Sequence, residues 1–489
     1  MSRRRAAAFA LVTAGILSGC ATPSPVAVRA PASAESQDRP RGGPVVPVAP
    51  PAPAVRTLGR VTLGAVGDVL MHEAVKRSAE THGQGAPDGG YAWLYAPVAD
   101  LLAEPDVTFA NLETPVAPRA GAGAAVREFF FNAPPAAVAA LAHAGVDVVN
   151  VANNHLFDLG RAGFEETLAQ LDAAGMPYVG AGPVGRAAGP TLVERNGLRI
   201  ALLAYAYGYN QAGNECPPGA GTCAVGARLD REWALADVRA AAATADAVVV
   251  SLHWGKEYAS QPLEEDVAFA HRLVDAGALV VLGHHPHVLQ PVELHPRPDG
   301  SCAVIAYSLG NFVSNQSRFY VHGVTPLASP EQSGAPRDGV LLRVALERRD
   351  YGRGVVRVEL AGADWLPLWT ENDTAEIDAR REPGRRPAIR VVSIDRALAA
   401  VRAGLAEFPD PVPADRRDAW ARLRRREALF LARRAAIAAV VGEDLERTLG
   451  PAELAGPVGA AAPLAPGAVS RAPAPEARGS AAATPAAER

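Results

Sequence analysis

Cysteine and aromatic residues are scarce in this chain of 489 residues, which has four cysteines and 6% aromatic residues. No two cysteines stand in a CxxC spacing, which argues against a zinc site built on cysteine. The formal net charge is −4, so no polybasic footprint points to DNA or RNA, and we expect no nucleic acid partner. Because 49% of the residues are hydrophobic and glycine follows no three-residue period, the chain is neither wholly disordered nor collagen-like.

The first apolar run is too short to cross a membrane. Arg3, Arg4 and Arg5 precede an apolar stretch over residues 6–17, which is below the about 20 residues that a bilayer requires. We therefore predict a signal peptide over residues 1–19. The ending Leu-Ser-Gly-Cys resembles a bacterial lipobox, which implies cleavage before Cys20 and lipidation of its thiol. An ordinary signal peptide with an incidental cysteine is the alternative.

These features predict an exported protein, anchored by lipid to the outer face of the plasma membrane or periplasmic in a Gram-negative host. In such an oxidising compartment Cys216 and Cys223 can close a small loop, which leaves Cys302 as an odd, buried thiol.

Composition divides the rest of the chain. Residues 20–57 are rich in proline and alanine and predict a tether, and residues 451–489 are similar and predict a disordered tail. Residues 58–370 predict a folded domain, followed by a mixed, mainly helical extension over 371–450. The arginine-rich helix expected near its end either binds an anionic lipid or polymer or presents a solvated basic face.

Short β-branched runs alternate with Ala- and Leu-rich stretches over most of the domain. Glycines at 145, 175 and 277 follow helical stretches and favour helix-to-strand turns. This alternation predicts an α/β layered fold. The expected strands are Val61–Val66, Val107–Ala110, Val146–Val151, Ile200–Tyr205, Ala247–Leu252, Ala278–Leu282, Ala303–Tyr307, Val340–Leu346 and Val355–Leu360.

Polar clusters follow directly after six of these runs. Because the carboxyl ends of parallel strands share one edge of a sheet, the clusters are expected to meet in one crevice. They are Gly67-Asp68 with His72, Asn111-Leu112-Glu113, Asn153-Asn154-His155, His253 to Tyr258, His284-His285-Pro286-His287 and Ser308 to Phe312.

Carboxylate, imidazole and amide groups are the ligands of Mn²⁺, Fe²⁺ or Zn²⁺. Two such ions bind an anionic substrate and activate a bridging water. A bridging carboxylate is needed to hold the two ions close together, and Asp68 and Glu113 are the candidates. Some of these residues also have a simpler interpretation. Asn153, Asn154 and Asp158 can be helix caps, and capping is favoured for Asp158. By default the remaining histidines, among them His271 and His295, are ordinary surface or core residues.

Taken together, the motifs resemble the bacterial capsule-synthesis family associated with poly-γ-glutamate, the CapA type. The resemblance covers residues 60–345 and rests on the order of Gly67-Asp68, Asn111-x-Glu113, Ala152 to His155, His253-Trp254-Gly255-x-Glu257-Tyr258, His285-Pro286-His287-x-x-Gln290 and Ser308 to Phe312. It implies a calcineurin-like, four-layer αββα metallophosphatase-like sandwich with a C-terminal helical appendage, facing outward from the membrane.

The same resemblance implies roles for single residues. Asp68 and His287 would hold one divalent ion and His253 and His285 a second, with Asn154 beside it. His155 would be the leaving-group acid, next to Asn154, and Glu113 a candidate bridge. Two departures from the metallophosphatase pattern are that the histidine nearest Asp68 is His72, and that Asn111-x-Glu113 replaces Gly-Asp-x-x-Asp. The candidates for binding substrate are Lys256, Glu257 and Asn311.

Three functions fit these observations. The first is a metal-dependent hydrolase or transferase acting on an anionic cell-surface polymer, with poly-γ-glutamate favoured. The second is a non-catalytic lipoprotein that binds the polymer or a membrane synthase complex through a degenerate metal site. The third, a secreted phosphodiesterase acting on nucleotides or lipid headgroups, rests on fold analogy alone.

Overall fold

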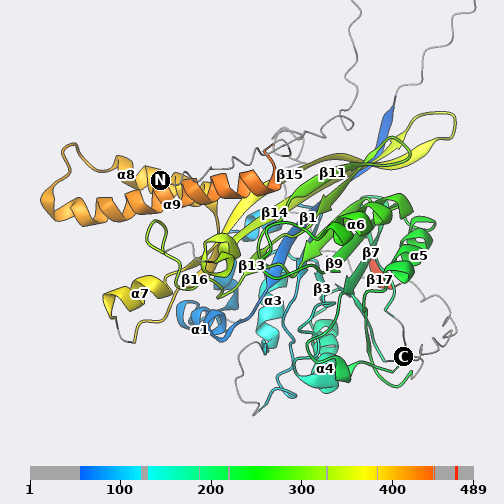
Figure 1. The fold of residues 1–489 in the computed structure, drawn as a ribbon, viewed down its shortest axis with the longest axis horizontal. Coiled ribbons are helices and arrows are strands. Elements are labelled where there is room, and N and C mark those ends of the chain that lie inside the picture. The colour runs from blue at the N-terminus through cyan, green and yellow to red at the C-terminus, as the bar shows by residue number, and fades with distance from the viewer. Residues whose placement is uncertain are drawn as a thin grey trace, which may run out of the picture.

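Two β-sheets packed face to face form the centre of the molecule, as the computed structural model shows (Figure 1). The structure describes residues 55–86, 88–122, 130–184, 186, 188–217, 221–325, 329–382, 384–443, 445 and 468–471. The expected signal peptide, Cys20 and nearly all of the tether lie outside these residues. No helix within the described ranges combines the length and the apolar character that a membrane crossing requires.

The first sheet is mixed. Its central strands are buried along most of their length, because helices cover one face and the second sheet covers the other. β1 pairs in parallel with β2 and β13 and antiparallel with β14, and Asp68 stands at its carboxyl end. The strand order is β16 (Ile389–Ser393), β15 (Val356–Asn372), β14 (Asp338–Asp350), β1 (Arg56–Val69), β2 (Val107–Asn111), β3 (Val148–Asn150) and β4 (Tyr178–Val179), with β13 (Asn311–Val313) beside β1.

The second sheet has a parallel centre and antiparallel edges. Its parallel strands end at His253 and His284, which face each other in the register. The order is β11 (Val292–Pro296), β12 (Cys302–Ala306), β10 (Val280–His284), β9 (Ala247–His253), β7 (Leu198–Ala206), β6 (Thr191–Arg195) and β17 (Val469–Arg471). A small separate pair joins β5 (Ala181–Gly182) and β8 (Val225–Gly226).

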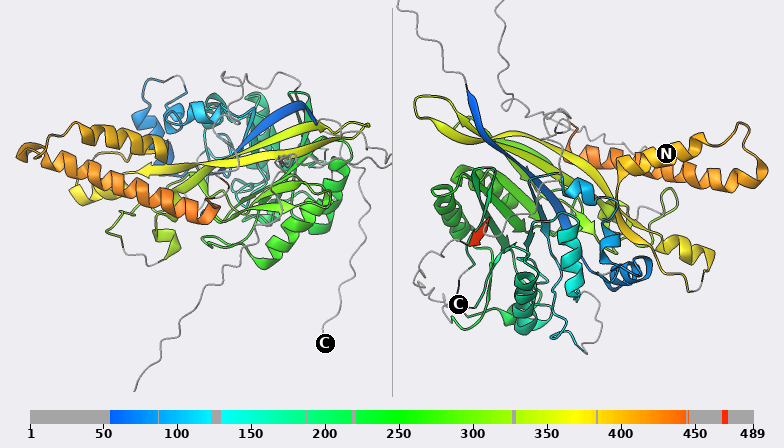
Figure 2. Two further views of the ribbon diagram at one scale, coloured as in Figure 1. Left: turned by 90° about the horizontal axis from the view of Figure 1, so that it is seen from above. Right: turned by 180° about the vertical axis from the view of Figure 1, so that it is seen from behind.

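Helices lie outside both sheets and complete the four layers (Figures 1 and 2). Apolar side chains such as Leu63, Phe109 and Val249 fill the space between the sheets. The predicted α/β layered fold is confirmed, and Gly145, Gly175 and Gly277 have the positive φ expected just after helices. The helices are α1 (Glu73–His82), α2 (Ala99–Leu102), α3 (Pro135–His143), α4 (Gly160–Ala173), α5 (Arg231–Ala242), α6 (Glu264–Ala276), α7 (Thr374–Arg380), α8 (Ile394–Ala406) and α9 (Arg417–Val441).

The C-terminal helical appendage is also confirmed: α8 and α9 pack against each other and extend away from the sheets (Figure 2). The first sheet nevertheless continues past residue 370, because β16 pairs with β15. Some of the arginines of α9 bind acidic residues of other elements: Arg426 binds Glu371 of β15, Arg433 binds Asp338 of β14 and Arg434 binds Asp395 of α8.

Two expectations are wrong. Most of the tail expected over residues 451–489 lies outside the described residues; within it, β17 pairs with the edge strand β6, so the expectation of disorder is wrong for Val469–Arg471. Cys302 is neither odd nor fully buried, because it is disulfide-bonded and half-buried. The predicted loop closure by Cys216 and Cys223 is confirmed, since these two residues form a disulfide.

Candidate metal centre

The strand registers bring the predicted polar clusters together at one edge of the two sheets. Asp68 lies opposite Asn111, which in turn lies opposite Asn150 on the next strand. In the second sheet His253 lies opposite His284. The clusters therefore meet, as expected from the shared direction of the parallel strands.

Two glycines allow the turn after β12 to approach this edge closely. A Cβ built on Gly67 would lie 1.9 Å from the carbonyl oxygen of Gly310, and one built on Gly283 would lie 1.8 Å from that of Tyr307. Any larger residue would push the backbones apart. This close approach places Asn311 beside Asp68 in the parallel pairing of β1 and β13.

Asp68 is fully buried and accepts hydrogen bonds on both carboxylate oxygens. Asn111 Nδ2 and His284 Nδ1 donate to Oδ1 at 2.8 and 3.1 Å, and His287 Nδ1 donates to Oδ2 at 3.1 Å. Burial disfavours the charged form, but the hydrogen bonds from His284 and His287 outweigh it and hold the pKa of Asp68 well below its usual range. Asp68 is therefore a carboxylate.

Glu113 occupies the middle of the cluster. Its Oε1 lies 3.5 Å from His253 Nε2 and 3.9 Å from both His155 Nε2 and His287 Nε2. This oxygen is buried and has no hydrogen-bond partner among the described residues. Burial, together with the negative charges of Asp68, Glu257 and Asp158, raises the pKa of Glu113 well above its usual value.

Two groups of possible metal ligands share Glu113. In one, Glu113 meets His285 and His287, and in the other it meets Asp68 and His253, with the ligand atoms of each group within 4.8 Å of one another. The His253 Nε2 atom also lies 2.8 Å from Asn154 Oδ1. The family resemblance implies that Asp68 pairs with His287 and His253 with His285. In the structure the same residues form different pairs, since His285 is grouped with His287 and Asp68 with His253.

The imidazoles of His253 and His285 are neutral, the form that binds a metal ion. Burial and the neighbouring His285 lower the pKa of His253 well below its usual value, and burial and His287 lower that of His285 to about 3. The Nδ1 atom of His285 is buried without a partner among the described residues. His285 and His287 have φ values of 96° and 57°, a left-handed conformation that costs energy in residues other than glycine and recurs at functional sites.

These observations fit a divalent cation. The Oε1 atom of Glu113 and the Nδ1 atom of His285 are buried and have no hydrogen-bond partner among the described residues, so each can donate an electron pair to a metal ion. Several buried acidic groups in one place demand positive charge, which a metal ion supplies. The donor set of carboxylate, imidazole and amide suits Mn²⁺, Fe²⁺ or Zn²⁺.

His155 lies at the side of the cluster and is held by Asp158. The Nδ1 atom of His155 donates to Asp158 Oδ2 at 2.8 Å, and the backbone N–H of Phe131 donates to the same oxygen at 2.8 Å. The capping interpretation of Asp158 is wrong, because α4 begins at Gly160 without a side-chain cap. Asp158 instead orients the imidazole of His155.

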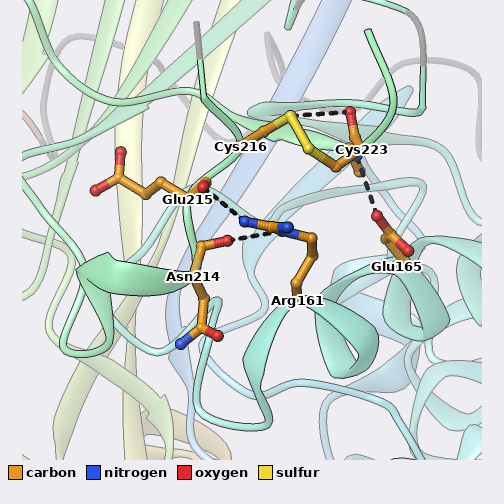
Figure 3. The surroundings of a disulfide bond; sticks show 7 residues. Arg161, Glu165, Asn214, Glu215, Cys216 and Cys223 are labelled. Atoms are coloured by element: carbon orange, nitrogen blue, oxygen red, sulfur yellow. Dashed lines mark hydrogen bonds between the residues drawn. A yellow bond between two sulfur atoms is a disulfide. The ribbon is translucent and has the colours of Figure 1, made fainter. Parts of the chain in front are cut away.

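The loop that precedes the Cys216–Cys223 disulfide supports Asn154 from outside the cluster. The backbone N–H of Asn210 donates to the carbonyl oxygen of Asn154 at 2.8 Å, and the two side-chain amides are hydrogen-bonded. Further along this loop, Arg161 of α4 donates to the carbonyl oxygens of Asn214 and Glu215, next to the disulfide (Figure 3). The loop is thus fixed at both ends.

The three predicted substrate-binding residues lie in different environments. Lys256 and Glu257 are exposed, and Glu257 is near enough for its charge to affect Glu113. Asn311 is buried and donates through Nδ2 to the carbonyl oxygen of His287, so it holds the backbone of that histidine in place. Sequence reasoning missed Tyr207, which is 45% exposed and has its ring centroid 4.8 Å from that of His285.

Comparison with known proteins finds one family over this region. The family model described as bacterial capsule synthesis protein PGA_cap matches residues 62–316. The PGA biosynthesis protein CapA of Bacillus subtilis is 32% identical over 270 residues, which cover 54% of this chain and 66% of that one. The capsule biosynthesis protein CapA of Bacillus anthracis is 31% identical over 262 residues, or 53% and 60% of the two chains.

The chain thus matches less than two thirds of the length of these curated relatives. Among solved structures, the calcineurin-like phosphoesterase YfkN from Bacillus subtilis aligns with 63% of this chain and 90% of its own, at 14% identity and a TM-score of 0.31. The family match begins within β1 and ends just after Asn311. It therefore contains every residue of the metal cluster described above.

Proposed function

The chain belongs to the bacterial capsule synthesis protein family, and from that premise we propose that it acts in capsule biosynthesis as a metal-dependent hydrolase or transferase. The proposed substrate is an anionic cell-surface polymer, with poly-γ-glutamate favoured. The observation that supports this most directly is Glu113, whose unpartnered buried oxygen lies within both groups of possible ligands. A carboxylate shared in this way is what two adjacent ions require.

In this proposal Asp68, Glu113, Asn154 and the three histidines 253, 285 and 287 hold the ions. Bound divalent ions act as Lewis acids and lower the pKa of a water molecule, which supplies the nucleophile. His155 donates a proton to the leaving group, since Asp158 holds its Nδ1 and turns its Nε2 toward Glu113.

The proposed substrate class follows from the names of the relatives, and the charge of the chain decides which groups can attract such a substrate. Two relatives are named for capsule or PGA biosynthesis. The chain has a formal net charge of −4, so its overall field does not attract a polyanion. Attraction must come from the ions themselves and from nearby cations such as Lys256, while the exposed ring of Tyr207 offers an apolar contact.

Export and lipid anchoring through Cys20 are part of the same proposal, as is association with a membrane synthase complex. The disulfide between Cys216 and Cys223 supports an oxidising compartment. Because Cys216 and Cys223 are paired with each other, an intrachain disulfide at Cys302 would use the thiol of Cys20, so that disulfide and lipidation of Cys20 exclude each other. Mass spectrometry of the N-terminal peptide tests the anchor: a diacylglyceryl group supports it, and recovery of Cys20 in a disulfide overturns it.

The catalytic proposal is tested by comparing the full chain with a variant carrying His285→Ala and His287→Ala. We expect the wild type to contain about two more equivalents of transition metal than the variant. The wild type should shorten or transfer poly-γ-glutamate, and the variant should lose this activity while its melting temperature shows that it folds. His143→Ala, an exposed histidine on α3, is the control and should change neither.

Other outcomes point elsewhere. Metal binding without any change in the polymer would replace catalysis with polymer binding or attachment to a synthase. Hydrolysis of an aryl phosphodiester, with the polymer left intact, would overturn the polymer as substrate. Equal metal content in the wild type and the variant, even after reconstitution, would overturn the hydrolase proposal.

A further inference from the structure

A second group of potential metal ligands lies away from the centre described above, where α6 meets the edge of the second sheet. Glu293 and His295 stand two residues apart on the edge strand β11, so their side chains share a face. His271 reaches them from α6. This group shares no residue with the ligand groups built around Glu113.

Both imidazoles converge on one carboxylate. His271 Nε2 lies 3.0 and 3.1 Å from the two oxygens of Glu293, and His295 Nδ1 lies 2.8 Å from Oε1. The two rings are stacked, with centroids 3.9 Å apart and planes 18° apart. Stacking therefore holds two ring nitrogens and a carboxylate oxygen around one small volume.

The carboxylate is itself oriented by a neighbour. Tyr307, at the end of β12, donates its hydroxyl hydrogen to Glu293 Oε2 at 2.6 Å. Outer hydrogen bonds of this kind fix the direction of a ligating carboxylate and are a regular part of metal sites. The Oε1 atom is left facing both histidines.

The cluster is open to solvent. The side chains of His271, Glu293 and His295 are 34%, 32% and 19% exposed. An ion bound there can enter from solvent and keep water in a remaining position. Two histidines, one carboxylate and one open position form a known ligand set for zinc.

We propose that His271, Glu293 and His295 form an additional divalent-metal site that takes Zn²⁺ or another borderline ion. With zinc–ligand bonds of about 2.0–2.2 Å, tetrahedral ligand atoms stand roughly 3.3 Å apart. The observed separations of 2.8–3.1 Å from Glu293 widen to this value with small side-chain movements. The ion would link α6 to the edge strand β11 and so stabilise the second sheet.

The test measures zinc bound by the full chain at a fixed free Zn²⁺ concentration, after treatment with a chelator. We expect His271→Ala and His295→Ala each to bind one equivalent less than the wild type, or to bind it at least tenfold more weakly. The zinc-induced rise in melting temperature should fall with it. His143→Ala, an exposed histidine outside the cluster, should behave as the wild type.

A variant of the other centre separates this site from the proposed function. The chain with His285→Ala and His287→Ala should still bind one equivalent that His271→Ala removes; if that chain does not fold, Glu113→Gln takes its place. Equal zinc content and equal melting response in wild type and His271→Ala would overturn the proposal. The three residues would then be a hydrogen-bonded cluster only.

Discussion

The Nδ1 atom of His155 lies 2.8 Å from Asp158 Oδ2, and both side chains are buried beside the metal cluster. The same carboxylate oxygen accepts the backbone N–H of Phe131, which fixes its position. Because Nδ1 is occupied, Nε2 is the atom of His155 that faces Glu113. A carboxylate that orients an imidazole in this way sets both its direction and its tautomer.

Replacing this carboxylate should impair catalysis without removing metal. We expect Asp158→Asn to lower turnover by about 10- to 100-fold, because the amide no longer holds the Nδ1–H of His155. Metal content and melting temperature should stay close to those of the wild type. The control is Asp172→Asn, an exposed carboxyl on α4. Unchanged turnover would show that His155 is not the proton donor.

Removing the charge of Glu113 should weaken metal binding at the centre. Glu113→Gln keeps the shape of the side chain but cannot bridge two cations, so metal content should fall by at least one equivalent relative to the wild type. The metal-free protein should melt at or above the wild-type temperature, because a buried carboxyl with a raised pKa is replaced by a neutral group. Full metal content, measured beside the exposed control Glu264→Gln, would contradict the bridging role.

The disulfide-closed loop should affect both stability and the metal centre. Replacing Cys216 and Cys223 by serine removes a link across a short loop and should lower the free energy of unfolding by about 2 kcal/mol. Asn210, in the segment that leads into this disulfide, holds Asn154, so metal affinity should also fall, by about tenfold. Gly213→Ala is a control in the same segment, because a Cβ there meets nothing within 4 Å. Metal affinity that is unaffected by the double replacement would mean that Asn154 needs no support from the loop.

The sequence predicts those parts of the site that depend on strand ends. Asp68, Glu113 and His253 follow apolar runs whose direction in the sheets determines where the side chains meet. The family resemblance rests on the order of these motifs along the chain, and it implies the layered fold. Such features need no knowledge of how distant side chains pack.

Contacts across the fold could not be predicted in this way. Asp158 has the position expected of a helix cap, and only the packing of Phe131 and His155 against it shows its role. Tyr207 has no motif around it. The sequence predicts ordinary histidines at 271 and 295, because residues on a helix and an edge strand show no spacing that predicts their meeting.

The dependence of stability on pH should show the contribution of Glu166 on α4. Its carboxylate accepts the backbone N–H of Ala120 at 2.8 Å and both the backbone N–H and Nε of Arg119, at 3.0 and 2.9 Å. Burial favours the neutral form, but these hydrogen bonds outweigh it and lower the pKa of Glu166 below its usual value. The folded protein therefore binds fewer protons at this site than the unfolded chain.

A carboxyl whose pKa is lowered by folding stabilises the protein above its unfolded pKa of about 4.3 and loses this effect as the pH falls through the folded value. At pH 7, Glu166→Gln should lower the free energy of unfolding by about 1 kcal/mol, because a charged acceptor is replaced by a neutral amide. The difference in melting temperature between the two proteins should be largest at pH 7 and shrink steadily below about pH 4. The exposed control Asp172→Asn should change the melting temperature little at either pH. A difference that grew as the pH fell would mean that folding raises the pKa of Glu166, and that Arg119 and Ala120 do not hold its charged form.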